Sequence, residues 1–188
     1  MCMMLPAARG RPSSATPILD TALHLLDEGR SVSLDSVAKA AGLTKPGLMY
    51  HFPTKAALMG ALVDHVVDNL ESDLIQRLVG PVETASPAER LRAYVQWALE
   101  STHRRSDLVM LADPKLADRL TERWIARFDR WVAIPADAPE QERARYQAAR
   151  LIADGAWLAA TTNAFPLTAE EQPHVLKVAL QLLGDPTP

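Results

Sequence analysis

Cysteine and long apolar runs are nearly absent from this sequence. The single cysteine, Cys2, can form neither a disulfide nor a cysteine-based metal site within one chain. Continuous apolar stretches such as residues 56–59 and 156–160 are far shorter than the roughly 20 residues that cross a bilayer. Near the start, Arg9 and Arg11 follow the few apolar residues, which reverses the order found in a secretory signal. We expect a cytoplasmic protein with no membrane partner.

Patterns typical of β-strands are also missing. No segment alternates apolar and polar side chains, whereas many segments place apolar residues three and four positions apart. With 48% hydrophobic and 23% charged residues, the chain of 188 residues has the balance of a globular protein. The sequence therefore predicts an all-α fold with about nine helices. They are expected at residues 16–29, 34–41, 44–52, 54–79, 87–104, 107–111, 115–132, 140–164 and 173–183.

Charge is distributed unevenly along the chain. The formal net charge is −3, which by itself does not favour a protein that binds polyanions. Residues 1–55, however, carry six basic and four acidic side chains, whereas the rest of the chain carries 14 basic and 19 acidic ones. A polyanion such as nucleic acid is therefore expected to meet the first third of the chain.

Residues 34–52 have the spacing of a helix-turn-helix. Ala38 is small enough for two crossing helices to approach, and Gly42 suits the left-handed backbone that ends the first helix. Ser33 is expected to cap this helix, but the capping box is expected to be incomplete because Ser36 stands where Glu is usual. Thr44 is expected to cap the second helix, so that free N–H groups face outward toward a phosphate. The small core beneath the turn is expected to contain Val37, Leu43 and Leu48.

Polar and basic side chains cluster around the second helix of this motif. Lys45, Tyr50, His51 and Lys55 lie on or beside it, and a helix of this length fits the major groove of DNA. Lys55 either binds a phosphate together with backbone N–H groups or is a solvated surface residue. His51 either contacts phosphate or packs beside Phe52. A plain helical hairpin is the structural alternative to the motif as a whole.

Residues 18–62 resemble the tetracycline-repressor (TetR) family of bacterial transcriptional regulators. The resemblance rests on the opening amphipathic helix, on residues 37–42 (VAKAAG) and on residues 50–55 (YHFPTK), which lead into the long helix. It implies a homodimer of all-helical subunits with three DNA-binding helices, a connecting helix and a domain for ligand binding and dimerisation. The chain departs from the common family pattern at Met49 and at Pro46–Gly47. Few direct hydrogen bonds to bases are therefore expected.

Spacing and resemblance together divide the chain into expected parts. These are a flexible arm at residues 1–15, a helix-turn-helix domain at 16–55, and a ligand-binding and dimerisation domain at 56–188 that begins with the connecting helix 56–79. The two arginines of the arm are expected to reach phosphates or a narrow minor groove. The expected DNA-binding residues are Thr44, Lys45, Pro46, Gly47, Tyr50, His51, Lys55, Arg9 and Arg11.

Aromatic and acidic residues of the second domain suggest a ligand cavity. All four tryptophans follow residue 95, so a helical bundle can bring some together, although each alone is more readily an ordinary core residue. Asp154 lies in an apolar stretch, where an unpaired carboxylate is costly to bury. Its partner is either a basic residue, such as Arg145 or Arg150, or a cationic ligand. Asp113 and Asp118 are expected near the cavity. The expected ligand-binding residues are Trp97, Glu100, Asp107, Met110, Trp124, Phe128, Trp131, Asp154 and Trp157.

Small and apolar residues near the end of the chain predict a subunit interface. Ala156 and Ala160 permit close helix approach, and the last helix is apolar almost all round. One subunit can bury such a helix on both sides, but a four-helix interface with a two-fold partner also does so and matches the family resemblance. The expected interface residues are Ala156, Ala160, Val175, Val178, Ala179 and Leu182.

The sequence contains no recognisable catalytic pattern. Its histidines lack metal-ligand spacing, and it has neither a nucleophile elbow nor a phosphate-binding glycine loop. We therefore expect a protein that is not an enzyme and needs no metal or cofactor. The expected function is that of a repressor released from a palindromic operator by a small amphipathic effector, and the aromatic and acidic residues suggest a cationic compound as one hypothesis for it. The alternative is a helical module that binds hydrophobic small molecules and no DNA.

Overall fold

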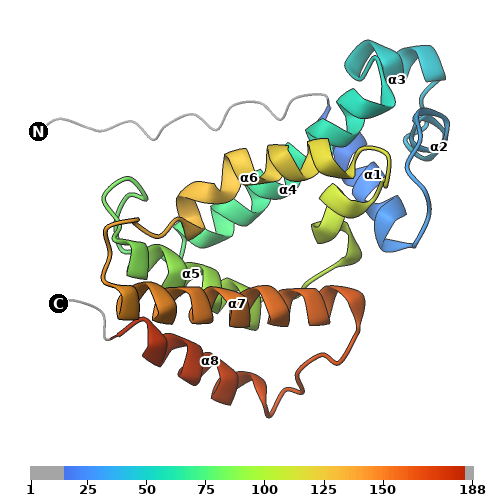
Figure 1. The fold of residues 1–188 in the computed structure, drawn as a ribbon. Helices are drawn as coiled ribbons and strands as arrows, with labels where there is room; N and C mark the ends of the chain where they lie inside the picture. Colours follow the sequence, from blue (N-terminus) through green and yellow to red (C-terminus); the bar gives the residue numbers. More distant parts are fainter. Residues whose placement is uncertain (1–14, 185–188) are drawn as a thin grey trace, which may run out of the picture.

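A computed structural model describes residues 15–184, and every regular element within this range is a helix (Figure 1). This confirms the all-α prediction. None of the helices is long and apolar enough to span a bilayer in the described part of the chain. The elements are α1 (Thr16–Asp27), α2 (Leu34–Ala40), α3 (Lys45–His51), α4 (Lys55–Ile75), α5 (Pro87–Glu100), the 3₁₀ helix η1 (Arg105–Leu111), α6 (Ala117–Val132), α7 (Glu140–Thr162) and α8 (Gln172–Leu182).

The three N-terminal helices form one end of the molecule (Figure 1). Helix α4 starts there and runs back along α6, whereas α5 lies beside α7 and α8 packs on the far side of that pair. The short helix η1 contacts α1, α4, α6 and α7. It therefore joins the N-terminal helices to the bundle.

Side-chain caps fix where the N-terminal helices begin. Thr44 Oγ1 accepts the Gly47 N–H at 3.2 Å, and Thr54 Oγ1 accepts the Ala57 N–H at 3.0 Å, so α3 and α4 both start on a threonine. At α2 the expectation of an incomplete capping box is wrong. The Ser36 hydroxyl accepts the Ser33 N–H at 2.9 Å and thus replaces the usual glutamate.

The helix-turn-helix has a small core that the sequence predicted in part. Val37, Ala38 and Leu48 are buried, and Gly42 has the left-handed backbone (φ +67°) expected at the end of α2. Leu43 is not in this core, because it follows the turn glycine and keeps 38% of its surface exposed. The tight turn thus turns this leucine outward, beside the start of α3.

Two helices end earlier than their apolar pattern predicts. Helix α4 stops at Ile75, where Arg77 donates to the Asp73 carbonyl at 2.8 Å and to the Ser101 hydroxyl at 3.1 Å. Helix α5 stops at Glu100, and the His103 ring nitrogen Nε2 lies 3.0 Å from the Ala98 carbonyl. In both cases a side chain bonds the carbonyls that another helical turn would have used.

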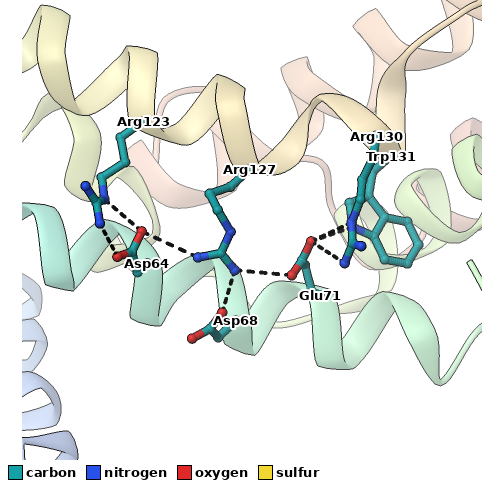
Figure 2. A network of polar contacts seen from close by, with 7 residues as sticks. All are labelled: Asp64, Asp68, Glu71, Arg123, Arg127, Arg130 and Trp131. Carbon is teal, nitrogen blue, oxygen red and sulfur yellow. Dashed lines mark hydrogen bonds and ion pairs between the residues drawn. The ribbon is translucent and has the colours of Figure 1, made fainter.

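The seam between α4 and α6 is a ladder of ion pairs (Figure 2). Arg123 forms a two-pronged pair with Asp64, at 2.8 and 2.5 Å, and Arg127 reaches Asp68 at 2.6 Å. Further along, one carboxylate, Glu71, lies 2.8 Å from Arg130 Nη2 and accepts the Trp131 indole N–H at 3.0 Å. The ladder fixes α4 to α6 along about two turns, because its acids stand on one helix and its arginines on the other.

Candidate functional site

The start of α3 presents an open set of backbone and side-chain groups. Its cap, Thr44, is exposed, and Pro46 occupies the first turn, where no N–H is needed. A Cβ at Gly47 would lie 3.2 Å from the capping oxygen. Glycine at this position therefore leaves the cap undisturbed, which gives a structural reason for the unusual Pro46–Gly47 pair.

The outer face of α3 carries aromatic side chains. Tyr50 is 87% exposed, and its ring meets the His51 ring edge-on at 5.3 Å. His51 is half-buried, and its ring centroid lies 6.3 Å from that of the buried Phe52. It therefore packs beside Phe52 and also keeps part of its ring exposed, as each of the two roles considered from the sequence requires. An exposed tyrosine on a seven-residue helix is a group that can enter a DNA groove.

Both lysines of this region are held by carboxylates. Lys45 Nζ lies 3.0 Å from Asp35, and Lys55 Nζ lies 2.5 Å from Asp113. The hydrogen bond from Lys55, together with one from the Lys115 N–H, holds the pKa of Asp113 below its usual range. Asp113 was expected near the ligand cavity, but it lies at the start of α4 instead. A phosphate at either lysine has to replace a carboxylate. Arg9 and Arg11 lie outside the described residues.

A cavity of about 380 Å³ opens between α1 and the bundle. Trp97, Trp124, Trp157 and Asp107 were expected at a ligand site, and the structure brings all four to this cavity. The sequence missed the residues that α1, α4 and the segment before η1 contribute, because only the tertiary fold turns them toward one space. These further lining residues are Asp20, Leu23, His24, Asp27, Val66, Asn69, Leu70, Asp73, Ser101, Thr102, Arg104 and Ser106.

The three tryptophans of the cavity form one aromatic wall. The Trp124 and Trp157 rings are nearly parallel, at 15°, with centroids 5.6 Å apart. Trp97 contacts Trp157 at 5.8 Å and a tilt of 58°. The predicted convergence of tryptophans is therefore present, although it involves three of the four.

The same tryptophan pair borders a second pocket, of about 340 Å³, which also contains Phe128 and Asp154. Asp154 lies 2.6 Å from Arg150 Nη1 and accepts the Tyr94 hydroxyl at 2.8 Å. The partner of this acid is thus the internal arginine rather than a required cationic ligand. Burial of Tyr94, reinforced by the Asp154 charge, raises the pKa of the phenol, which therefore remains a hydrogen-bond donor.

Three residues expected in the ligand cavity lie elsewhere. Trp131 is fully buried and donates to Glu71 in the α4–α6 seam, Met110 is packed in the core, and Glu100 is exposed at the end of α5. Their neighbours in sequence could not reveal this, because the direction of each side chain depends on which helix packs against it. No group of three or more acidic, histidine or cysteine side chains in the described part of the chain could hold a metal ion.

The outer face of α7 and α8 is apolar but differs from the predicted interface in detail. Ala179 is fully buried within the subunit, so it cannot contact a partner. Val178 and Ala160 are exposed, and Leu151 and Leu158, which share one face of α7, are exposed as well. Ala156, Val175 and Leu182 are half-buried. The apolar surface left open is therefore centred on two leucines that the sequence prediction omitted.

Comparisons with known proteins agree with this architecture. The family model of bacterial regulatory proteins, tetR family, matches residues 18–62, and the model of the tetracyclin repressor-like C-terminal domain matches residues 88–184. The HTH-type transcriptional regulator EthR of Mycobacterium tuberculosis is 28% identical over 156 residues, which cover 79% of this chain and 72% of that protein.

Solved structures share the fold at low sequence identity. The multidrug binding protein EbrR in complex with malachite green superimposes with a TM-score of 0.62 and 19% identity, over 91% of this chain and 98% of the other. A TetR family member from Streptomyces coelicolor A3 gives a TM-score of 0.61 with 18% identity and the same coverage.

Proposed function

The chain belongs to the TetR family of bacterial regulatory proteins and is a ligand-responsive, DNA-binding transcriptional regulator, and from this premise we propose that it is a homodimeric repressor of a palindromic operator. The observation that carries the proposal is the start of α3, where the Thr44 cap and the exposed Tyr50 stand on one short helix. Because it acts on DNA, we place its site of action in the cytoplasm.

On the DNA side, the proposal assigns residues 16–55 to the DNA-binding domain and α3 to the major groove. The Thr44 hydroxyl and the N–H groups at the start of α3 meet a phosphate, and Tyr50 reaches into the groove. Lys45 and Lys55 transfer from their carboxylate partners to phosphates. Half-buried His51 supports Tyr50 and reaches a phosphate only from its exposed edge. Arg9 and Arg11 complete the surface from the arm at residues 1–15.

On the subunit side, residues 56–188 hold the ligand and form the dimer. The exposed leucines 151 and 158 of α7 and Val178 of α8 provide the apolar surface that a two-fold partner covers. Such a pairing makes a four-helix interface and presents two copies of α3 to one duplex. Half-sites of the operator are then one helical turn apart or more.

On the effector side, a small amphipathic molecule binds between the helices and favours a state in which the two α3 helices no longer match the operator. EbrR, which shares this fold, binds malachite green and ethidium, and a similar class of ligand is proposed here. The proposal includes no catalytic step, because the polar groups described above pair with one another rather than converge on a reactive atom.

Binding to duplexes from the DNA that flanks the gene tests the proposal. Fluorescence anisotropy should give saturable binding that weakens as salt rises, and sedimentation velocity should show a dimer that forms a complex of two subunits with one duplex. A protein that dimerises but binds no flanking duplex at low salt would overturn the proposal and favour the helical hydrophobe-binding module.

A further inference from the structure

The cavity beneath α1 is built from both parts of the chain. Leu23 and Asp27 belong to the first helix of the DNA-binding motif, whereas Trp124 and Trp157 belong to α6 and α7 of the bundle. Its volume of about 380 Å³ lies within the usual range of small-molecule sites. A molecule bound there contacts a DNA-binding helix directly, in addition to the bundle.

The tryptophan wall of this cavity favours a flat ring system. The rings of Trp124 and Trp157 are nearly parallel, and the Trp97 ring contacts that of Trp157 at an angle. The faces of indole rings attract positive charge, because the π-electrons make them negative.

Carboxylates also line the cavity. Asp20, Asp27, Asp73 and Asp107 line it, and Arg104 is the one lysine or arginine among the lining residues. An anionic ligand is therefore disfavoured, and a cation is attracted to the carboxylates at the same time as its ring lies against the indoles.

The carboxylates of the cavity differ in how strongly they are already bonded. Asp20 lies 2.7 Å from His65 Nε2, and Asp27 accepts the Ser106 N–H at 2.9 Å. No described residue forms a hydrogen bond or an ion pair with the Asp73 carboxylate. Asp73 is therefore the acid most available to a ligand. In the second pocket Arg150 already neutralises Asp154, so the same argument does not apply there.

We propose that the cavity between α1 and the bundle is the effector site and that it takes a planar aromatic cation, an inference that rests on the proposed function. The bond from Ser106 to Asp27 then becomes the switch. It joins η1 to the end of α1, and a cation drawn to Asp27 weakens it because the carboxylate turns toward the ligand. Freed from η1, α1 shifts and carries the helix-turn-helix away from its operator spacing.

Ligand binding is tested first without DNA, so that the outcome does not depend on the operator. Rhodamine 6G and fluorescein have the same xanthene ring system and opposite charge, and spermidine is a cation with no ring. Tryptophan fluorescence and equilibrium dialysis on the full-length protein should show rhodamine 6G bound at least about tenfold more tightly than either of the others. Equal binding of fluorescein, or tighter binding of spermidine, would overturn the assignment.

Matched variants locate the site. Asp73→Asn should weaken rhodamine 6G binding by about five- to tenfold, because it removes an available charge without breaking an internal bond. Asp129→Asn is the control, since Asp129 is exposed and lines only the second pocket. A loss at position 129 with none at position 73 would place the dye in the second pocket and contradict the proposal.

The switch is tested in the absence of dye. Asp27→Ala should lower operator affinity by about tenfold because the bond to Ser106 is lost, whereas Asp27→Asn keeps an acceptor and should lose clearly less. Circular dichroism confirms that both variants are folded. Unchanged operator affinity in Asp27→Ala would overturn the switch, and so would unchanged operator affinity of the unmodified protein once rhodamine 6G is bound. If no operator is found, the proposed function fails while the dye measurements still decide the site.

Discussion

Helices α3 and α6 use positive charge in opposite ways. Helix α6 carries four arginines in 16 residues, and three of them are held by carboxylates of α4 (Figure 2). Helix α3 carries a single lysine in seven residues, yet it stands at the exposed end of the molecule. Among the described helices, the one with the most arginines thus uses them to hold the bundle together, and the proposed DNA-reading helix has only one lysine.

This difference shows that charge in a sequence does not by itself locate a polyanion site. What matters is whether the charge has an internal partner. Within the first 55 residues Lys45 and Lys55 are also paired, with Asp35 and Asp113. The DNA-binding surface proposed above therefore relies on backbone N–H groups, Tyr50 and exchange of carboxylate for phosphate more than on an excess of free lysines.

The largest expected effect is a loss of stability when the ion-pair ladder between α4 and α6 is broken. Glu71→Ala removes a carboxylate whose side chain is 11% exposed and leaves Arg130, Arg127 and the Trp131 indole N–H without it. We expect the free energy of unfolding to fall by about 2–3 kcal/mol, which is less than the roughly 3–5 kcal/mol of a fully buried pair because the arginines are partly solvated. Urea denaturation followed by circular dichroism, at one fixed protein concentration, measures it.

Asp68→Asn is the matched control for this prediction. Asp68 pairs with Arg127 in the same ladder, but its side chain is 61% exposed, and exposed pairs contribute about 0–1 kcal/mol. If the two variants destabilised the protein equally, burial would not distinguish the rungs of the ladder, and the view of Glu71 as its centre would be wrong.

Local signals made the N-terminal helices predictable. Thr44 and Gly42 act through neighbours within a few residues, so their cap and left-handed turn could be read directly from the sequence. The same applies to the helix count and to the resemblance over residues 18–62. The serine that completes the α2 box was missed, because Ser36 performs a role usually given to glutamate or glutamine.

Which side chains line the cavity depends on tertiary packing and could not be predicted from the sequence. Trp131 and Trp124 stand seven positions apart on one helix. Trp131 is buried and donates a hydrogen bond to Glu71, whereas Trp124 lines the cavity. Asp27 entered the cavity from α1, a helix that the pattern assigned to DNA binding alone. Cavity residues come from segments far apart along the chain, so no local periodicity marks them.

Operator affinity should depend more on an aromatic group of α3 than on a positive charge of α6. Tyr50→Ala should weaken operator binding by about tenfold, or roughly 1–2 kcal/mol, without lowering stability, because the ring is exposed and is proposed to contact DNA. Arg130→Gln removes a full positive charge and should change operator affinity less than about twofold, since Arg130 faces Glu71. Anisotropy titrations at one salt concentration measure both.

A stronger loss at position 130 than at position 50 would reverse the comparison. Net charge would then govern DNA binding, and the partners of each charge would not. Thermal unfolding of both variants keeps the measurement interpretable, because a decrease in operator affinity counts only where the variant is folded at the assay temperature.

The smallest expected effect concerns the exchange of partners at Lys55. Asp113→Asn leaves an acceptor for the Lys115 N–H but removes the charge that holds Lys55. Lys55 then meets a phosphate without giving up a carboxylate, so operator affinity should rise by about two- to fivefold. The plot of log affinity against log salt should steepen by up to about one unit, because a free lysine contributes one more released counterion.

The pH dependence and a double variant decide whether this rise acts through Lys55. The pKa of Asp113 is lowered, so its pairing energy is complete above the unfolded value near 3.9 and is lost only as pH falls through the lower folded pKa. The gain from Asp113→Asn should therefore be constant between about pH 6 and 8. It should vanish when Lys55→Gln is added, because the freed group is then absent. A gain that survives in the double variant would mean that Asp113 opposes DNA by simple repulsion, and that Lys55 does not exchange partners.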